Sequence, residues 1–152
     1  MPIRKIVYCT DFSENAEDAF TAALEMAEKF RAKLSIVHVL PPVVNPLLTD
    51  TDWVSPYEPI QSFVTKVESQ MHREYGSRIG KHIDHEFVVL DGHVSTEIVK
   101  YLEENKADLA IVGSYGLTGV GLVVFGSVAN RVAHKAPCSV LIVRKGSENK
   151  EQ

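Results

Sequence analysis

A glycine-rich stretch from residue 113 to residue 127, GSYGLTGVGLVVFGS, holds five of the chain's nine glycines. Inside an ordered element, glycine costs roughly 0.5–1 kcal/mol relative to alanine. A cluster of this density therefore has a physical reason. Either the backbone makes tight left-handed turns, or a ligand approaches the backbone more closely than a Cβ atom would permit.

The stretch joins a predicted strand to a predicted helix, an arrangement that often binds phosphate. Gly113 and Gly116 follow the strand, and Gly126 with Ser127 begins the helix. The first turn of a helix offers unpaired backbone N–H groups and the positive end of the helix dipole. The stretch has neither the lysine of a Walker A loop nor the G-x-G-x-x-G spacing. On the residues alone, phosphate binding and a purely structural glycine turn both stay open.

Strand and helix patterns alternate along the whole chain. Apolar, β-branched runs predict five strands, at residues 3–10, 33–40, 82–90, 108–115 and 138–145. Apolar residues at helical spacing predict helices between them, at residues 16–30, 60–75, 94–105 and 128–136. Near-continuous apolar strands separated by helices predict an α/β fold, a doubly wound parallel sheet with helices on both faces. Such sheets bind ligands at the carboxyl ends of their strands, where the strand order reverses.

One long segment interrupts this alternation. Residues 41–59 hold five of the seven prolines and the single tryptophan, Trp53. We interpret the segment as a flexible loop, either a functional lid or a mobile surface excursion. Residues 1–146 are predicted to form a single domain, and residues 147–152 a disordered tail.

The composition is typical of a soluble globular protein. The chain has 152 residues, 45% of them hydrophobic, and a net charge of −4. It carries no basic stripe, which disfavours nucleic acid as the main partner. It has neither the apolar core of a signal peptide nor a membrane-spanning stretch, so we predict a cytoplasmic protein. Cys9 and Cys138 lie among apolar residues, which favours reduced thiols, with a single disulfide as the alternative.

Several motifs together resemble the universal stress protein family. The pattern Gly113-x2-Gly116-x9-Gly126-Ser127 matches the spacing of that family's ATP-binding signature, G-2x-G-9x-G-(S/T). The stretch IVYCTDFSENAEDAF resembles the family's first strand and acidic loop, and SIVHVL resembles its second strand. The stretch GSVANRVAHKAPCSVLIVR resembles its last helix and strand. The similarity runs from about residue 2 to residue 145.

This resemblance implies a Rossmann-like sheet with the strand order 3-2-1-4-5. It also implies an adenine nucleotide as ligand (ATP, with AMP or ADP as alternatives), together with Mg²⁺. In the implied site, a carboxylate contacts the ribose, a backbone at the end of the second strand contacts adenine, and glycines and a helix start hold the phosphates. Asp11 corresponds to the carboxylate and Val39 to the backbone that contacts adenine. The glycines and the helix start correspond to Gly113, Gly116, Gly126, Ser127 and Val128.

The chain departs from the family pattern in one respect. Many relatives carry a lysine, arginine or histidine in or just before the loop between the second and third motif glycines, and this chain has none there. Backbone N–H groups, the helix dipole and Mg²⁺ would then neutralise the phosphates. Arg131, one turn beyond Ser127, is a candidate cation, and a surface ion pair is its alternative role.

The histidines do not predict a metal site. His82 and His85 lie three residues apart on a predicted strand, so their side chains would point to opposite faces. His38 is predicted to be a hydrogen-bonded residue of a buried strand. His93 would lie at the sheet edge, away from the point where the strand order reverses. No nucleophile–base motif is present either, and we predict no dedicated catalytic centre.

The last predicted strand, Cys138–Lys145, would form an exposed apolar edge in this strand order, and such edges pair readily with other chains. The resemblance implies that a homodimer covers it, and the charged tail is the alternative cover. Three functions remain open: a nucleotide-dependent regulator of the stress response, a nucleotide-independent interaction module, and a slow ATPase. An adenylyl transferase of the same fold is disfavoured because the chain has no S-G-G-x-D-S loop.

Overall fold

The computed structural model describes residues 1–40, 60–114 and 126–145. Three features of the sequence lie outside the described residues. These are the proline-rich segment 41–59, Gly116 with the middle of the glycine-rich stretch, and residues 146–152, which include the predicted tail 147–152.

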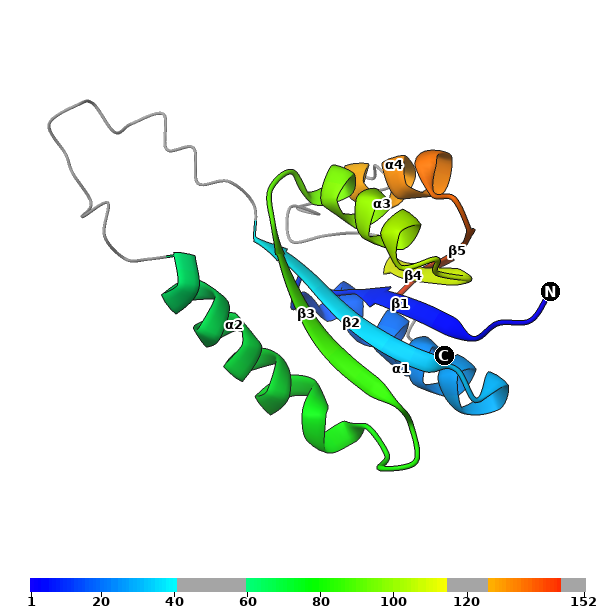
Figure 1. Ribbon diagram of the computed structural model, residues 1–152, viewed down its shortest axis with the longest axis horizontal. Helices are drawn as coiled ribbons and strands as arrows, with labels where there is room; N and C mark the ends of the chain where they lie inside the picture. The colour runs from blue at the N-terminus through cyan, green and yellow to red at the C-terminus, as the bar shows by residue number, and fades with distance from the viewer. Residues whose placement is uncertain (41–59, 115–125, 146–152) are drawn as a thin grey trace, which may run out of the picture.

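Five strands form one parallel sheet with the order β3-β2-β1-β4-β5 (Figure 1). Their bounds are β1 Lys5–Cys9, β2 Lys33–Leu40, β3 His85–Asp91, β4 Leu109–Gly113 and β5 Ser139–Val143. The predicted strand order and doubly wound architecture are therefore confirmed. The chain runs from β1 to β2 and β3 on one side, and then to β4 and β5 on the other side of β1. The strand order thus reverses between β1 and β4, which is where such sheets bind ligands.

Helices cover both faces of the sheet. Their bounds are α1 Glu14–Phe30, α2 Ile60–Tyr75, the short 3-10 helix η1 Gly76–Arg78, α3 Val94–Glu104 and α4 Ser127–Lys135. Helices α1 and α2 lie on one face, and α3 and α4 lie on the other (Figure 1). Among the residues described, no helix has both the length and the apolar character needed to cross a bilayer.

The predicted elements are all present, and the largest shift of a strand boundary is at the start of the third strand. The third strand was predicted from residue 82 but begins at His85. Residues 80–83 form a turn instead, in which the backbone N–H of Ile83 donates to the carbonyl of Gly80 at 3.0 Å. The prediction that His82 and His85 share a strand is therefore wrong.

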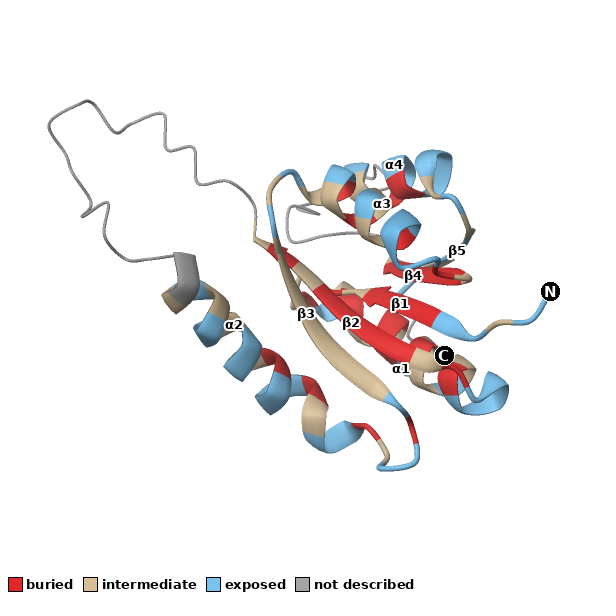
Figure 2. Ribbon diagram, viewed as in Figure 1, coloured by how far each residue is buried: buried red, intermediate tan, exposed pale blue. Residues whose placement is uncertain are grey.

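Each face of the sheet has its own core. Ile6 and Tyr8 of β1 pack with α1 and α2, whereas Val7 and Cys9 pack with α3 and α4. This alternation follows from the two-residue period of a strand, which sends successive side chains to opposite faces. Figure 2 shows buried residues concentrated on the central strands, while the edge strand β3 is half-buried along most of its length.

An aromatic cluster packs α1 and α2 against β1. The ring centroid of Phe20 lies 5.6 Å from that of Tyr8 and 4.6 Å from that of Tyr75, and all three side chains are fully buried. The guanidinium of Arg78 lies 4.6 Å from the Phe20 ring centroid. It also donates two hydrogen bonds to the Glu17 carboxylate, at 2.7 and 3.2 Å. The cluster joins α2 to β1 and α1, from which it is far removed in the sequence.

Candidate functional site

The connection from β1 to α1 holds Asp11 at the carboxyl end of the sheet. Its Oδ1 atom accepts a hydrogen bond from the backbone N–H of Ser13 at 2.9 Å, which closes a tight turn. Phe12, between them, has a φ of 62°, a left-handed conformation that costs of order 1 kcal/mol for a residue with a side chain. The Tyr8 hydroxyl donates to the carbonyl of Ala16 at 2.8 Å and so fixes the first turn of α1 against β1. The half-buried Asp11 carboxylate is therefore held in a defined position.

Strand β2 extends further toward this end than β1 does. Its last pairing with β1 joins Val37 to Cys9, whereas its pairing with β3 continues to Leu40. The backbone of Val39 therefore has a strand partner on the β3 side and no paired β1 residue on the other. A flat heterocycle could hydrogen-bond to that open edge as a further strand would.

His38 ties β2 to the turn that carries Asp11. Its Nδ1 atom lies 2.7 Å from the carbonyl oxygen of Thr10, and its ring centroid lies 4.7 Å from that of Phe12. Because a carbonyl can only accept, Nδ1 carries the proton. Burial lowers the pKa of His38, while the Thr10 carbonyl and the charge of Asp11 act in the opposite direction. His38 is thus the hydrogen-bonded strand residue that the sequence predicted.

A backbone hydrogen bond links the residue after β4 to the residue before α4. The backbone N–H of Ser114 donates to the carbonyl of Val143 on β5 at 2.9 Å. The carbonyl of Ser114 in turn accepts a hydrogen bond from the backbone N–H of Gly126, also at 2.9 Å. Gly113, the last residue of β4, and Gly126, the N-cap residue of α4, are therefore neighbours at the carboxyl end of the sheet.

The first turn of α4 is suited to an anion. Gly126, the N-cap residue, has no side chain that could cap the helix, so the N–H groups of Ser127 and Val128 receive no N-cap hydrogen bond from it. The first turn of α1 contains Glu14 and Glu17, whereas the first turn of α4 contains no acidic residue. The positive end of the α4 dipole thus has no acidic side chain of its own to complement it.

Two serine hydroxyl groups near this end are buried without a hydrogen-bond partner in the described structure. Ser114 is 2% exposed and Ser13 is 9% exposed. An unsatisfied buried hydroxyl costs about 1–3 kcal/mol. Ser114 links Gly113 to Gly126, and Ser13 belongs to the turn of Asp11. A polar ligand between these segments would relieve that cost.

The structure brings most of the predicted site residues to one end of the sheet. Those placed there are Asp11, Val39, Gly113, Gly126, Ser127 and Val128. The seventh predicted residue, Gly116, lies outside the described residues.

A contact between Arg131 and His93 was not predicted. The Nη1 atom of Arg131 lies 3.3 Å from the Nε2 atom of His93, the residue that precedes α3. Strand β3 is at the edge of the sheet as expected, but α3 and α4 pack on the same face and bring the two side chains together. Within the described ranges, no carboxylate lies within ion-pair distance of Arg131, so the alternative of a surface ion pair is not observed there. The four-residue spacing from Ser127 was the one sequence signal that pointed to Arg131.

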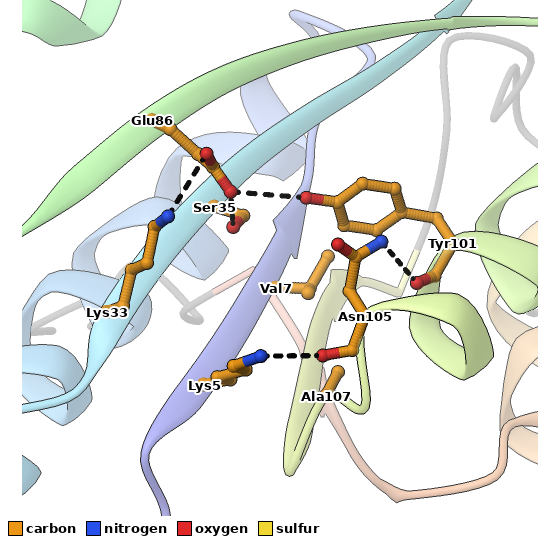
Figure 3. Close-up of a pocket in the computed structure, with 8 residues that line it drawn as sticks. All are labelled: Lys5, Val7, Lys33, Ser35, Glu86, Tyr101, Asn105 and Ala107. Carbon is orange, nitrogen blue, oxygen red and sulfur yellow. Dashed lines mark hydrogen bonds and ion pairs between the residues drawn. The ribbon is translucent and has the colours of Figure 1, made fainter.

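A small polar recess lies at the opposite, amino end of the sheet (Figure 3). Its volume is about 60 Å³, well below the roughly 300–1,000 Å³ of a typical small-molecule site. The carboxylate of Glu86 accepts from Ser35 at 2.8 Å and from Tyr101 at 3.4 Å, and it lies 3.2 Å from the ammonium of Lys33. Lys5 donates to a backbone carbonyl at 3.1 Å. These groups satisfy one another, so we interpret the recess as structural.

The histidines and cysteines of the described chain do not form a reactive centre. No group of three or more histidine, cysteine, aspartate or glutamate side chains in this part could hold a metal ion. Cys9 and Cys138 are unbridged and half-buried. Burial raises the pKa of the Cys9 thiol to about 12 and also raises the pKa of Cys138. Neither thiol is therefore a ready nucleophile near neutral pH.

Comparison with known proteins decides the family. The family model described as the universal stress protein family matches residues 2–144. The chain belongs to the universal stress protein family. A curated universal stress protein from Methanocaldococcus jannaschii is 35% identical over 147 residues, which cover 93% of this chain and 82% of that protein.

Solved universal stress proteins share the fold. The structure of UspA from Lactobacillus plantarum matches with a TM-score of 0.72 at 21% identity, covering 93% of this chain and 99% of that one. A universal stress protein solved in complex with cAMP matches with a TM-score of 0.67 at 24% identity, covering 95% of this chain and 98% of that one. One from Archaeoglobus fulgidus, solved in complex with dAMP, matches with a TM-score of 0.56 at 23% identity, with 93% and 98% covered.

Proposed function

We propose that this universal stress protein binds an adenine nucleotide, ATP in the first place, at the carboxyl end of its sheet and regulates the stress response according to occupancy. The observation that carries the proposal is the hydrogen bond from Gly126 to Ser114, which sets the uncapped first turn of α4 beside the end of β4. The neighbouring strand β1 leads to Asp11. The cAMP and dAMP complexes of structural neighbours support an adenine nucleotide as the ligand.

Each part of the nucleotide has a matching group in this proposal. Adenine pairs with the open backbone edge at Val39, and the ribose hydroxyls donate to the Asp11 carboxylate. The phosphates accept hydrogen bonds from the N–H groups of Ser127 and Val128 and from the buried Ser114 hydroxyl, which has no partner in the described structure. Mg²⁺, which commonly keeps several waters and binds through phosphates, needs no protein cage here.

Identification of the ligand retained by the purified protein tests the proposal. The protein is heat-denatured, and the released small molecules are identified by mass and quantified against protein. We expect an adenine nucleotide at close to one per chain, or, after its removal, a thermal shift on addition of ATP and Mg²⁺. Absence of both would favour a nucleotide-independent interaction module. Steady release of phosphate from ATP would favour an ATPase.

The variant Asp11→Asn tests the ribose contact. Asparagine keeps an Oδ1 acceptor for the Ser13 N–H, so the turn at the start of α1 is retained. It replaces an ionic acceptor by a neutral one, which weakens a hydrogen bond by roughly 1 kcal/mol or more. We expect the dissociation constants of ATP and adenosine both to rise about fivefold to tenfold in calorimetry, with little change in melting temperature. Equal affinities for variant and wild type would exclude Asp11 from the site.

We further propose that the protein is a homodimer that pairs through β5 and its flanking residues, Cys138–Lys145. Strand β5 is an edge of the sheet (Figure 1). Leu141 on this strand is 36% exposed. An exposed apolar edge is a template for pairing with a second chain. We expect Leu141→Lys to shift the species seen in sedimentation from dimer to monomer. A wild-type protein that is monomeric at high micromolar concentration would contradict this.

The two unbridged thiols fit a reducing compartment, and we propose a cytoplasmic location.

A further inference from the structure

The direction of the Arg131 side chain places its charge near the start of α4. Arg131 lies four residues after Ser127, and residues at this spacing share a helix face. Helical side chains lean toward the N-terminus of their helix. The 3.3 Å contact with His93 agrees with this direction, because His93 lies just beyond β3, at the carboxyl end of the sheet.

His93 holds the guanidinium without cancelling its charge. A guanidinium can only donate hydrogen bonds, so the Nε2 atom of His93 accepts through its lone pair, and the ring proton lies on Nδ1. That Nδ1 atom lies 2.9 Å from the hydroxyl oxygen of Thr96, which fixes the orientation of the ring. Arg131 thus keeps its full positive charge, and its contact with His93 uses one of its five N–H donors.

Among the described residues, no acidic side chain forms an ion pair with Arg131. A cation near a helix N-terminus is unfavourable, because the helix dipole is positive there. The first turn of α4 contains no acidic residue, and none of the ion pairs formed by the described residues includes Arg131. The buried Ser114 hydroxyl, whose backbone bonds Gly126, also has no partner there. A phosphate group would satisfy these donors and charges together.

We propose that Arg131 binds the phosphates of the nucleotide, with His93 as its positioning residue. The inference rests on the proposed function and adds the residue that distinguishes a nucleotide from a nucleoside. Arginine–phosphate pairs are charge-assisted and often bidentate. The contribution of Arg131 therefore grows with phosphate charge: it is largest for ATP, smaller for AMP and absent for adenosine.

Arg131→Gln tests the phosphate contact. Dissociation constants for ATP, AMP and adenosine are measured by calorimetry at one fixed ionic strength. We expect the affinity for ATP to fall about tenfold or more, the affinity for AMP to fall less, and the affinity for adenosine to stay unchanged. Lys135→Gln is the matched control, because it removes the same charge at the other end of α4. This control should bind all three ligands as the wild type does.

A pair of substitutions at His93 tests its positioning role. The side-chain oxygen of His93→Gln can still accept a hydrogen bond from Arg131, whereas His93→Leu removes the acceptor. We expect His93→Leu to weaken ATP binding about threefold without affecting adenosine, and His93→Gln to restore most of that loss. A purely structural role of His93 would lower the affinities for ATP and adenosine together, without rescue by glutamine.

Two results would overturn this inference and leave the proposed function intact. One is an Arg131→Gln protein that binds ATP as tightly as wild type, and the other is one whose affinities for ATP and adenosine fall equally. An equal effect of Lys135→Gln would also overturn it, because long-range charge would then explain the loss. If the wild type binds neither adenosine nor any adenine nucleotide, the proposed function falls, and this inference falls with it.

Discussion

Substitution of Gly126 by valine is expected to abolish nucleotide binding while leaving the protein folded. Gly126 has a φ of −44° and a ψ of 130°, and this negative φ lies outside the left-handed region that favours glycine. The backbone therefore imposes no need for glycine at this position. The branched side chain would instead occupy the space that the phosphates need beside the first turn of α4. Loss of two charge-assisted hydrogen bonds, each worth about 1.5–3 kcal/mol, corresponds to a rise of about 100-fold or more in the dissociation constant of ATP.

The measurement compares Gly126→Val with Gly126→Ala. A single methyl group intrudes less, so the alanine variant should lose less affinity for ATP than the valine variant. Adenosine, which has no phosphate, should bind both variants nearly as well as wild type. Melting temperatures report whether each protein remains folded. If the folded valine variant binds ATP with unchanged affinity, the phosphates lie elsewhere.

Substitution of Phe20 by alanine is expected to produce the largest loss of stability. The ring is fully buried, and it contacts the rings of Tyr8 and Tyr75 and the guanidinium of Arg78. Its removal takes away a large apolar surface and leaves a cavity where α1, α2 and β1 meet. Phenylalanine-to-alanine changes in cores cost about 3–5 kcal/mol, a large part of a total stability of about 5–15 kcal/mol. Urea denaturation should show this as a much lower midpoint with a similar slope.

Phe30→Ala is the matched control for this prediction. Phe30 is the last residue of the same helix, and 41% of it is exposed. Its substitution should cost clearly less than that of Phe20, because much of its surface is already exposed and its removal leaves no enclosed cavity. Equal losses for the two variants would mean that the aromatic cluster does not anchor α1 as the packing indicates.

Local patterns predicted the elements well because they depend on short-range stereochemistry. The apolar spacing of residues 60–75 follows the helical period, and α2 occupies that range in the structure. The run at residues 33–40 is likewise β2. The prediction failed at residue 82, because an apolar-looking run does not reveal that residues 80–83 close a turn. The order of the strands came from the family resemblance, since periodicity does not say which strands are neighbours.

The residues of the candidate site were likewise predictable only in part. Gly113, Gly126 and Ser127 could be named from the sequence, because glycines and a helix start at a strand end have recognisable local chemistry. Asp11 was named through the family resemblance. The contact of His93 with Arg131 could not be named from the sequence, and neither could the Ser114 hydroxyl, which has no partner among the described residues.

By itself, the sequence determined which segments are strands and helices and which residue types stand at their ends, because backbone sterics and side-chain periodicity act over a few neighbouring residues. The tertiary structure alone decided which side chains of different elements meet. Those contacts join residues tens of positions apart, such as His93 and Arg131, and they depend on how whole elements pack against the sheet.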